Sequence, residues 1–205
     1  EKEIKYPIVS YEITPDIAIL DPEVAAGMPP HVTAHTGMDV LTHAVEAYVS
    51  KAATSYTDPL AMEAIKLTVA YITRAYDNGQ DMEAREAMHN ASTLAGMAFT
   101  NASLGCVHSM AHKIGGKFHI THGLANAILL PYVIEFNREA TPKFAEIEKA
   151  LGVSDLAATI RDLNTRVGIG ASLKENGEVD IAPDQFQAAL KDMSQHACED
   201  PCTLT

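Results

Sequence analysis

Apolar residues recur at intervals of three and four through most of this chain, which is the spacing of an amphipathic helix. The clearest case follows Asp58-Pro59 and continues until Asn78-Gly79 provides a turn. Proline suits this start because the first N–H groups of a helix have no intrahelical partner. The pattern therefore predicts a helix over 58–77.

The same reasoning predicts helices on both sides of this one. Asp81 is a candidate N-cap for a long helix whose second half is rich in Ala, Ser, Gly and Thr, small residues that let helices approach closely. Gly115 and Gly116 are expected to end a later helix, because glycine accepts the left-handed conformation that closes a last turn. The other expected helices are 31–50, 82–104, the one carrying His108 and His112, 123–137, two short ones after Thr141-Pro142 and Ser154-Asp155, and 183–196. The predicted fold class is mainly α, a bundle of about seven to nine helices with a surface loop over 168–180.

The first residues of the chain have a different pattern. Two short runs, 6–9 and 16–20, are β-branched and bounded by proline or Asp-Pro, which is typical of strands. We expect 1–22 to be a β-strand remnant and linker from a missing nucleotide-binding domain. We expect 23–205 to be a helical metal-binding domain, truncated at its C-terminus.

Composition narrows the function classes. A chain of 205 residues that is 47% hydrophobic and 20% charged fits one globular domain. A net charge of −12 argues against binding to nucleic acid or to anionic lipid, both of which favour a basic surface. No apolar run approaches the ~20 residues of a membrane span. Three scattered cysteines do not make a disulfide framework, so a reducing cytoplasm is expected.

Candidate chemistry is concentrated in residues 105–123, which hold four of the nine histidines. His108 and His112 are four residues apart and share one face of a helix. His119 and His122 follow in a short connection before the next apolar run. Neutral imidazole is the commonest side-chain ligand for transition metals, so this segment indicates a metal site.

A second segment supplies further ligands. Asp39 and His43 are also four apart, on the helix predicted over 31–50. A carboxylate and an imidazole from one helix, with histidines from another helix and its following loop, can form a four-ligand site. Nitrogen and oxygen ligands of this kind suit both Fe(II) and Zn(II). We expect Glu46, which follows His43 by three, to be a helix-surface or capping carboxylate.

These segments resemble the metal-binding half of the iron-containing (group III) alcohol dehydrogenases. The similarity runs from about Tyr6 to about Asn137 and also extends to the alcohol dehydrogenase half of bifunctional aldehyde-alcohol dehydrogenases. Its most specific motifs are Ala18-Ile19-Leu20-Asp21-Pro22 with Met28-Pro29, Gly37-x-Asp39-x-x-x-His43-x-x-Glu46, and His108-x-x-x-His112 with His122-Gly123-x-Ala125-Asn126-Ala127-Ile128-Leu129-Leu130-Pro131.

The resemblance implies a site as well as a fold. It implies a helical domain like that of dehydroquinate synthase, with metal ligands at Asp39, His43, His108 and His122. It places His112 beside the substrate and the nicotinamide, as a catalytic and cofactor-contacting residue that does not bind the metal. Iron (Fe2+) is the implied ion, and zinc (Zn2+) is compatible with the same ligands.

The resemblance also implies an activity and partners. The parent enzyme would interconvert small alcohols and aldehydes with NAD(P), and it would be a cytoplasmic homo-oligomer, a dimer. Such enzymes carry an N-terminal nucleotide-binding domain with a glycine-rich loop, and this chain has no Gly-x-Gly-x-x-Gly motif. We therefore expect the chain to be a fragment that is inactive alone.

Three alternatives stay open. Glu86-x-x-His89 is half of the di-iron motif of ferritin-like bundles, but that site needs two copies and the chain has one. A closed four-ligand site in a non-catalytic scaffold would bind a metal without reactivity. A sister activity, such as a glycerol or other polyol dehydrogenase, would use a related domain.

Overall fold

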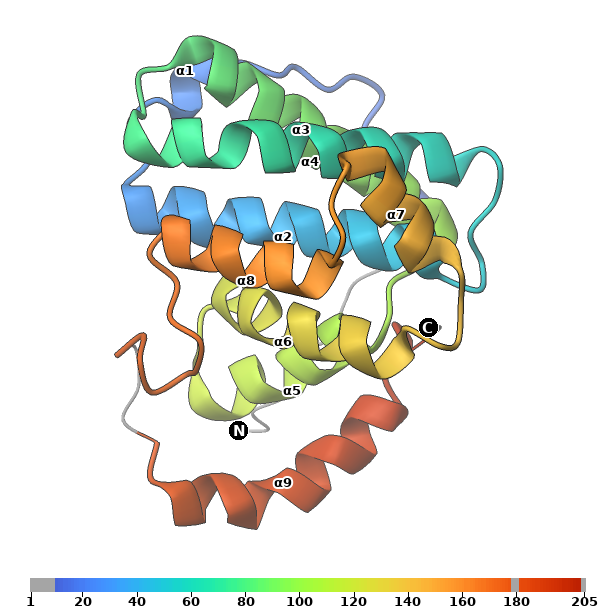
Figure 1. Ribbon diagram of the computed structural model, residues 1–205, viewed down its shortest axis with the longest axis vertical. Coiled ribbons are helices and arrows are strands. Elements are labelled where there is room, and N and C mark those ends of the chain that lie inside the picture. The colour runs from blue at the N-terminus through green and yellow to red at the C-terminus, as the bar shows by residue number, and fades with distance from the viewer. Residues whose placement is uncertain (1–9, 178–180, 204–205) are drawn as a thin grey trace.

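The computed structural model describes residues 10–177 and 181–203. This part of the chain is mainly α, as predicted, and none of its residues forms a strand (Figure 1). None of its helices is long and apolar enough to cross a membrane. The elements are a 3₁₀ turn, η1 (Tyr11–Ile13), and the helices α1 (Pro22–Ala25), α2 (Pro30–Val49), α3 (Thr57–Asp77), α4 (Met82–Ala102), α5 (Cys106–Phe118), α6 (His122–Asn137), α7 (Lys143–Leu151), α8 (Leu156–Arg166) and α9 (Pro183–Cys198).

Helix α2 lies at the centre of the molecule, between α3 and α4 on one side and α6 on the other (Figure 1). Its side chains are buried on more than one face, as with Met38, Val40 and Leu41, which suits a helix surrounded by others. The predicted small-residue stretch of α4 packs through one face only, with Ala91, Ala95 and other alanines fully buried. The central helix is therefore α2, and α4 lies beside it.

Two predicted helix starts are confirmed by their caps. The Asp81 carboxylate accepts the N–H of Ala84 at 3.1 Å at the start of α4. The Asp155 carboxylate accepts the N–H of Ala158 at 3.0 Å at the start of α8. Each bond satisfies one of the N–H groups that the first turn of a helix leaves without a partner. Residues 168–177 are irregular, as the turn residues there predicted.

The predicted end of α5 is wrong by about one turn. Gly115 and Gly116 lie inside the helix, which continues to Phe118. The left-handed residue after it is His119, with φ 56° and ψ 31°. Glycine can adopt that conformation but does not have to, so packing decides where the helix stops. One consequence is that His122 is the first residue of α6 and not part of a connecting loop.

The strand predicted over 16–20 is also absent from the described residues. This segment has no regular structure, and Ile19 is 88% exposed. A strand exists only as part of a hydrogen-bonded ladder, and no described residue forms one with it. The strand predicted over 6–9 lies outside the described residues.

The final helix returns the chain to α5. Helix α9 runs along the lower edge of the molecule in Figure 1 and contacts α5, where the rings of Phe186 and Phe118 stack with centroids 5.7 Å apart. Residues 199–203 then turn back against α5. A segment far along the sequence is thereby brought beside the central histidines.

Replacing Gly123 with alanine is expected to destabilise the fold. A Cβ at this position would lie 2.1 Å from the backbone oxygen of His35, because the first turn of α6 packs directly on α2. Overpacking of this kind typically costs about 1–3 kcal/mol. The matched control is Gly96→Ala in α4, where a new Cβ meets nothing within 4 Å. There the higher helix propensity of alanine should stabilise by up to about 1 kcal/mol. Urea unfolding of both variants measures the difference, and equal midpoints would contradict the close approach of α6 to α2.

Candidate metal centre

Three of the four predicted ligands converge on one point. Asp39 and His43 lie one turn apart on α2, and His108 lies in the first turn of α5. One ligand atom from each lies within 4.8 Å of the other two. The rings of His43 and His108 stack with centroids 4.4 Å apart, and His43 also stacks on Phe99 of α4 at 4.5 Å. The helical spacing predicted from the sequence thus places these side chains together.

The fourth predicted ligand, His122, also lies beside Asp39, and its ring centroid is 5.3 Å from that of His108. Its Nε2 atom is 3.7 Å from Asp39 Oδ1, and His108 Nε2 is 3.6 Å from the same oxygen. Gly123, the residue after His122, packs on the backbone of His35 in α2. Asp39 lies one turn further along α2, so this packing brings His122 close to Asp39. His122 therefore borders both Asp39 and His108, although it is not part of the group of three residues whose ligand atoms lie mutually close.

Asn126 occupies the point between these side chains. It follows His122 by one turn of α6, and its Nδ2 donates to Asp39 Oδ1 at 2.5 Å. The same nitrogen lies 3.2 Å from His108 Nε2 and 3.1 Å from His122 Nε2. The carboxylate oxygen and the two imidazole nitrogens thus surround a single donor. The Asn126 amide oxygen is buried with no hydrogen-bond partner among the described residues.

Glu46 orients His108. Glu46 is only 2% exposed, and its Oε2 lies 2.6 Å from His108 Nδ1. The same carboxylate accepts the backbone N–H groups of Val107 at 2.7 Å and His108 at 3.3 Å. It thereby caps α5, because the N-cap residue Gly105 has no side chain. Glu46 was predicted to be a helix-surface or capping carboxylate. It does cap a helix, but that helix is α5 and not its own helix α2, and Glu46 is buried instead of lying on the surface.

Burial and charge set the protonation of the cluster. Burial lowers the pKa of His43 to about 3, more than the nearby Asp39 carboxylate raises it. Burial would raise the pKa of Asp39, but the hydrogen bond with His108 and the charges of the histidines outweigh it and hold that pKa well below its usual range. Burial also opposes a charge on His108, yet bonds to Asp39 and Glu46 raise its pKa to about 9. The cluster therefore combines an anionic carboxylate with a neutral imidazole and a strongly basic one.

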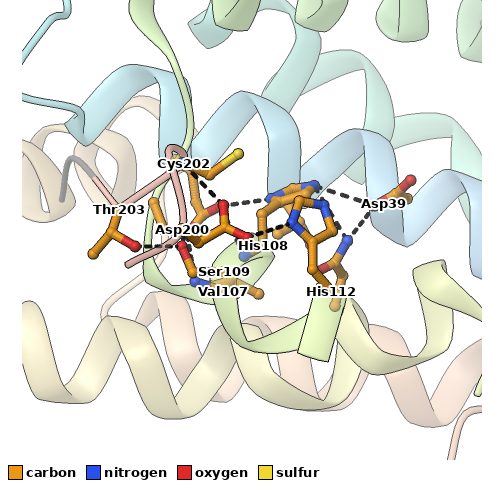
Figure 2. Close-up of polar contacts among 12 residues, drawn as sticks. Asp39, Val107, His108, Ser109, His112, Asp200, Cys202 and Thr203 are labelled. Carbon is orange, nitrogen blue, oxygen red and sulfur yellow. Dashed lines mark hydrogen bonds and ion pairs between the residues drawn. The ribbon is translucent and has the colours of Figure 1, made fainter. Parts of the chain in front are cut away.

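His112 lies beside this cluster. It follows His108 by one turn of α5, is 7% exposed, and its ring stacks on that of His122 with centroids 5.4 Å apart. It does not belong to the group formed by Asp39, His43 and His108. Its Nδ1 faces Asp200, at 3.2 Å from Oδ2, and Figure 2 shows Asp200 and Asp39 on opposite sides of the His112 ring.

Two residues at the site were missed from the sequence as separate candidates, Asn126 and Asp200. Asn126 had a detectable signal, because it lies four residues after His122 and so on the same helical face. Asp200 had none, since it follows α9 and reaches α5 only through the tertiary fold. Of the other histidines, His119 and His196 are exposed. The carboxylate and histidine of the di-iron alternative, at positions 86 and 89, belong to no ligand group among the described residues.

The chain is similar to known proteins of one family. The family model described as "Fe-containing alcohol dehydrogenase family, C-terminal" matches residues 33–205. An NADPH-dependent butanol dehydrogenase of Clostridium saccharobutylicum is 47% identical over 211 residues, which cover 98% of this chain and 53% of that protein. An aldehyde-alcohol dehydrogenase of Streptococcus pneumoniae is 43% identical over 223 residues, covering 97% of this chain and 25% of that protein.

A solved structure agrees in fold. The iron-containing alcohol dehydrogenase of Thermococcus thioreducens superposes with a TM-score of 0.86 and 38% identity, over 95% of this chain and 51% of that one. The chain thus spans about half the length of the butanol dehydrogenase and of this structure. The matched residues include every member of the cluster, from Asp39 to Asn126. The chain belongs to the iron-containing alcohol dehydrogenase family, in its C-terminal helical domain.

Proposed function

We propose that this chain is the metal-binding half of an NAD(P)-dependent alcohol dehydrogenase that interconverts small primary alcohols and aldehydes. We propose Asp39, His43, His108 and His122 as ligands of one divalent cation, with His112 as the proton carrier beside it. The observation that carries the proposal is that a carboxylate oxygen and two imidazole nitrogens, from three helices, meet around the Asn126 amide nitrogen.

These residues fit a divalent cation. A carboxylate oxygen and imidazole nitrogens that surround one point need a donor or a positive charge there, and the Asn126 N–H group now meets that need. A cation at that point would replace this donor once the Asn126 side chain rotated away. His43 is neutral and Asp39 anionic, which are the forms that bind metals. Nitrogen and oxygen ligands accept Fe2+ or Zn2+, and the family description favours iron.

Glu46 serves the proposed site by fixing one ligand. A carboxylate accepts hydrogen bonds and does not donate them, so a neutral His108 carries its proton on Nδ1 and its lone pair on Nε2. That lone pair faces Asp39 and Asn126. Carboxylates that hold metal-binding histidines in this way also make the imidazole a stronger ligand.

The proposed chemistry divides between the cation and His112. When bound, the cation supplies Lewis-acid chemistry toward an alcohol or carbonyl oxygen. His112 accepts the hydroxyl proton at Nε2 as the alcohol is oxidised and returns it when the aldehyde is reduced, because its Nδ1 is engaged by Asp200. The ring is buried, so the proton moves in a site with little water around it.

The proposal includes the rest of the enzyme. A nucleotide-binding domain N-terminal to this chain would bring the nicotinamide to the side of the cluster where His112 lies. Support comes from the NADPH-dependent butanol dehydrogenase, of which this chain covers 53%. We also propose a dimer in the cytoplasm, on the strength of the same family membership.

Changing His108 and His112 separately should have different effects in the longer enzyme. His108→Ala removes a proposed ligand, so metal content should fall heavily. His112→Ala leaves the ligands intact, so metal content should stay near that of the parent while alcohol oxidation slows by roughly 10²–10⁴, the contribution of a positioned acid–base group. Metal analysis and initial rates measure both quantities. Equal metal loss in the two variants would make His112 a ligand.

Glu46→Gln should weaken cation binding without unfolding the chain. The amide keeps the size of the side chain but no longer matches the His108 N–H and the helix N-terminus, and loss of such a supporting carboxylate typically costs 10–100-fold in metal affinity. Zinc titration against a competing chelator measures it, with urea unfolding as the check on folding. Glu63→Gln, at an exposed position of α3, is the matched control. Unchanged zinc affinity in Glu46→Gln would remove Glu46 from the site.

The 205-residue chain alone is expected to lack dehydrogenase activity. It supplies the proposed ligands and His112 but no glycine-rich nucleotide loop. NADH and NADPH formation with ethanol, butanol and 1,2-propanediol at saturating cofactor tests this expectation. Turnover above that of the metal without protein would show that the chain binds the nicotinamide nucleotide by itself.

A further inference from the structure

Asp200 is a buried carboxylate with three partners on two elements. It is 5% exposed and lies in the turn after α9. Its Oδ2 accepts from Lys113 Nζ at 2.7 Å and lies 3.2 Å from His112 Nδ1, while its Oδ1 accepts the N–H of Cys202 at 3.0 Å. The Lys113 ammonium and the Cys202 N–H group donate to different oxygens, so the carboxylate is used on both oxygens as an acceptor.

The turn that carries Asp200 is anchored independently of its carboxylate. The hydroxyl groups of Thr203 and Ser109 are 2.7 Å apart, which ties the turn to α5 (Figure 2). Thr203 also donates its hydroxyl to Ala197 O at 2.8 Å and its N–H to Asp200 O at 3.0 Å. Asp200 is therefore held in place by the backbone turn and not merely drawn to His112 by charge.

The charge on Asp200 is balanced by Lys113. Burial would raise the pKa of the Asp200 carboxyl, but the hydrogen bonds from Lys113, Cys202 and His112 outweigh it and lower that pKa to about 2. The carboxylate is therefore ionised at neutral pH and accepts only. A neutral His112 facing it must carry its proton on Nδ1, which leaves the Nε2 lone pair for the reacting side of the ring.

A cation site is a poorer interpretation of the same residues. His112, Asp200 and Cys202 offer ligand atoms within 4.8 Å of one another. However, Lys113 already places an ammonium group on Asp200. Burial and the adjacent Asp200 carboxylate raise the pKa of the Cys202 thiol to about 12, so it stays protonated and is not a thiolate ligand. The arrangement is that of an acceptor for His112.

We propose that Asp200 is the positioning residue for His112, holding its ring and its tautomer so that Nε2 faces the metal centre. This inference rests on the proposed role of His112 in proton transfer. It concerns a residue from the far end of the chain, placed by the turn after α9. Lys113 has a supporting part, because it keeps the carboxylate ionised and oriented.

Kinetics of Asp200→Asn in the longer enzyme provide the first test. The amide would present either an N–H or a weaker acceptor to His112, so kcat for alcohol oxidation should fall about 10–100-fold, in line with other residues that orient a functional imidazole. KM and metal content should stay near those of the parent, and Asp200→Glu should recover part of the loss. The control is Glu199→Gln, which changes the exposed carboxylate next to Asp200 in the sequence and leaves the Asp200 carboxylate and its turn in place. An equal kcat loss in Glu199→Gln would show that the effect is not specific to the Asp200 carboxylate and would overturn the proposal.

The tautomer gives a readout that does not depend on activity. The zinc-loaded chain, labelled with ¹⁵N-histidine, should show His112 protonated at Nδ1 and unprotonated at Nε2, with His112→Ala assigning the signals. In Asp200→Asn the Nε2-protonated form should appear. Unchanged nitrogen shifts in this variant would overturn the proposal. Full activity of His112→Ala would instead defeat the proposed function of His112, and a slow His112→Ala with a normal Asp200→Asn would defeat the positioning role alone.

Discussion

The contact between Glu46 and the first turn of α5 is the interaction on which the site depends. One buried carboxylate satisfies two backbone N–H groups and an imidazole, so its own charge is compensated by three hydrogen bonds. Without it, the N-terminus of α5 would be buried with no capping side chain, because Gly105 provides none. The same bond fixes the rotation of His108. The start of a helix and the direction of a proposed metal ligand are thus set by one residue on the central helix.

The polar groups of the site lie on the central helix, where burial makes polar side chains most costly. Asp39, His43 and Glu46 all project from α2, the helix most surrounded by others. Buried polar groups are costly unless they are hydrogen-bonded. Asp39 and Glu46 meet polar side chains of α6 and α5, whereas the His43 ring stacks on Phe99 of α4. The Asn126 amide oxygen is an exception within the described residues. Among these residues, only the nitrogen of the Asn126 amide is hydrogen-bonded, so no bond to its oxygen would be lost if the side chain rotated away when a cation binds.

Two successive turns of α5 carry the histidines to which we assign different roles. His108 faces α2 and is held by Glu46, whereas His112, one turn later, is held by Asp200 from the turn after α9. In each case a buried carboxylate meets a ring Nδ1, which leaves Nε2 free of that bond. Lys113 balances the second carboxylate, while backbone N–H groups stabilise the first. The different partners suit the roles that we propose. As a metal ligand, His108 needs its Nε2 lone pair held in one direction, whereas as a proton carrier His112 needs an Nε2 atom that can gain and lose a proton.

The sequence by itself determined the helices and the pairs within them. Spacing of four residues was enough to place Asp39 with His43 and His108 with His112, because the geometry of a helix is local. Tertiary structure decided the rest: that α5 continues through Gly115, that Glu46 caps a neighbouring helix, and that Asn126 fills the centre of the cluster. It also brought Asp200 to His112, across 88 positions of the chain. Local spacing fixes which side chains share a helical face, but which faces meet depends on burying apolar surface throughout the domain, and no short pattern contains that information.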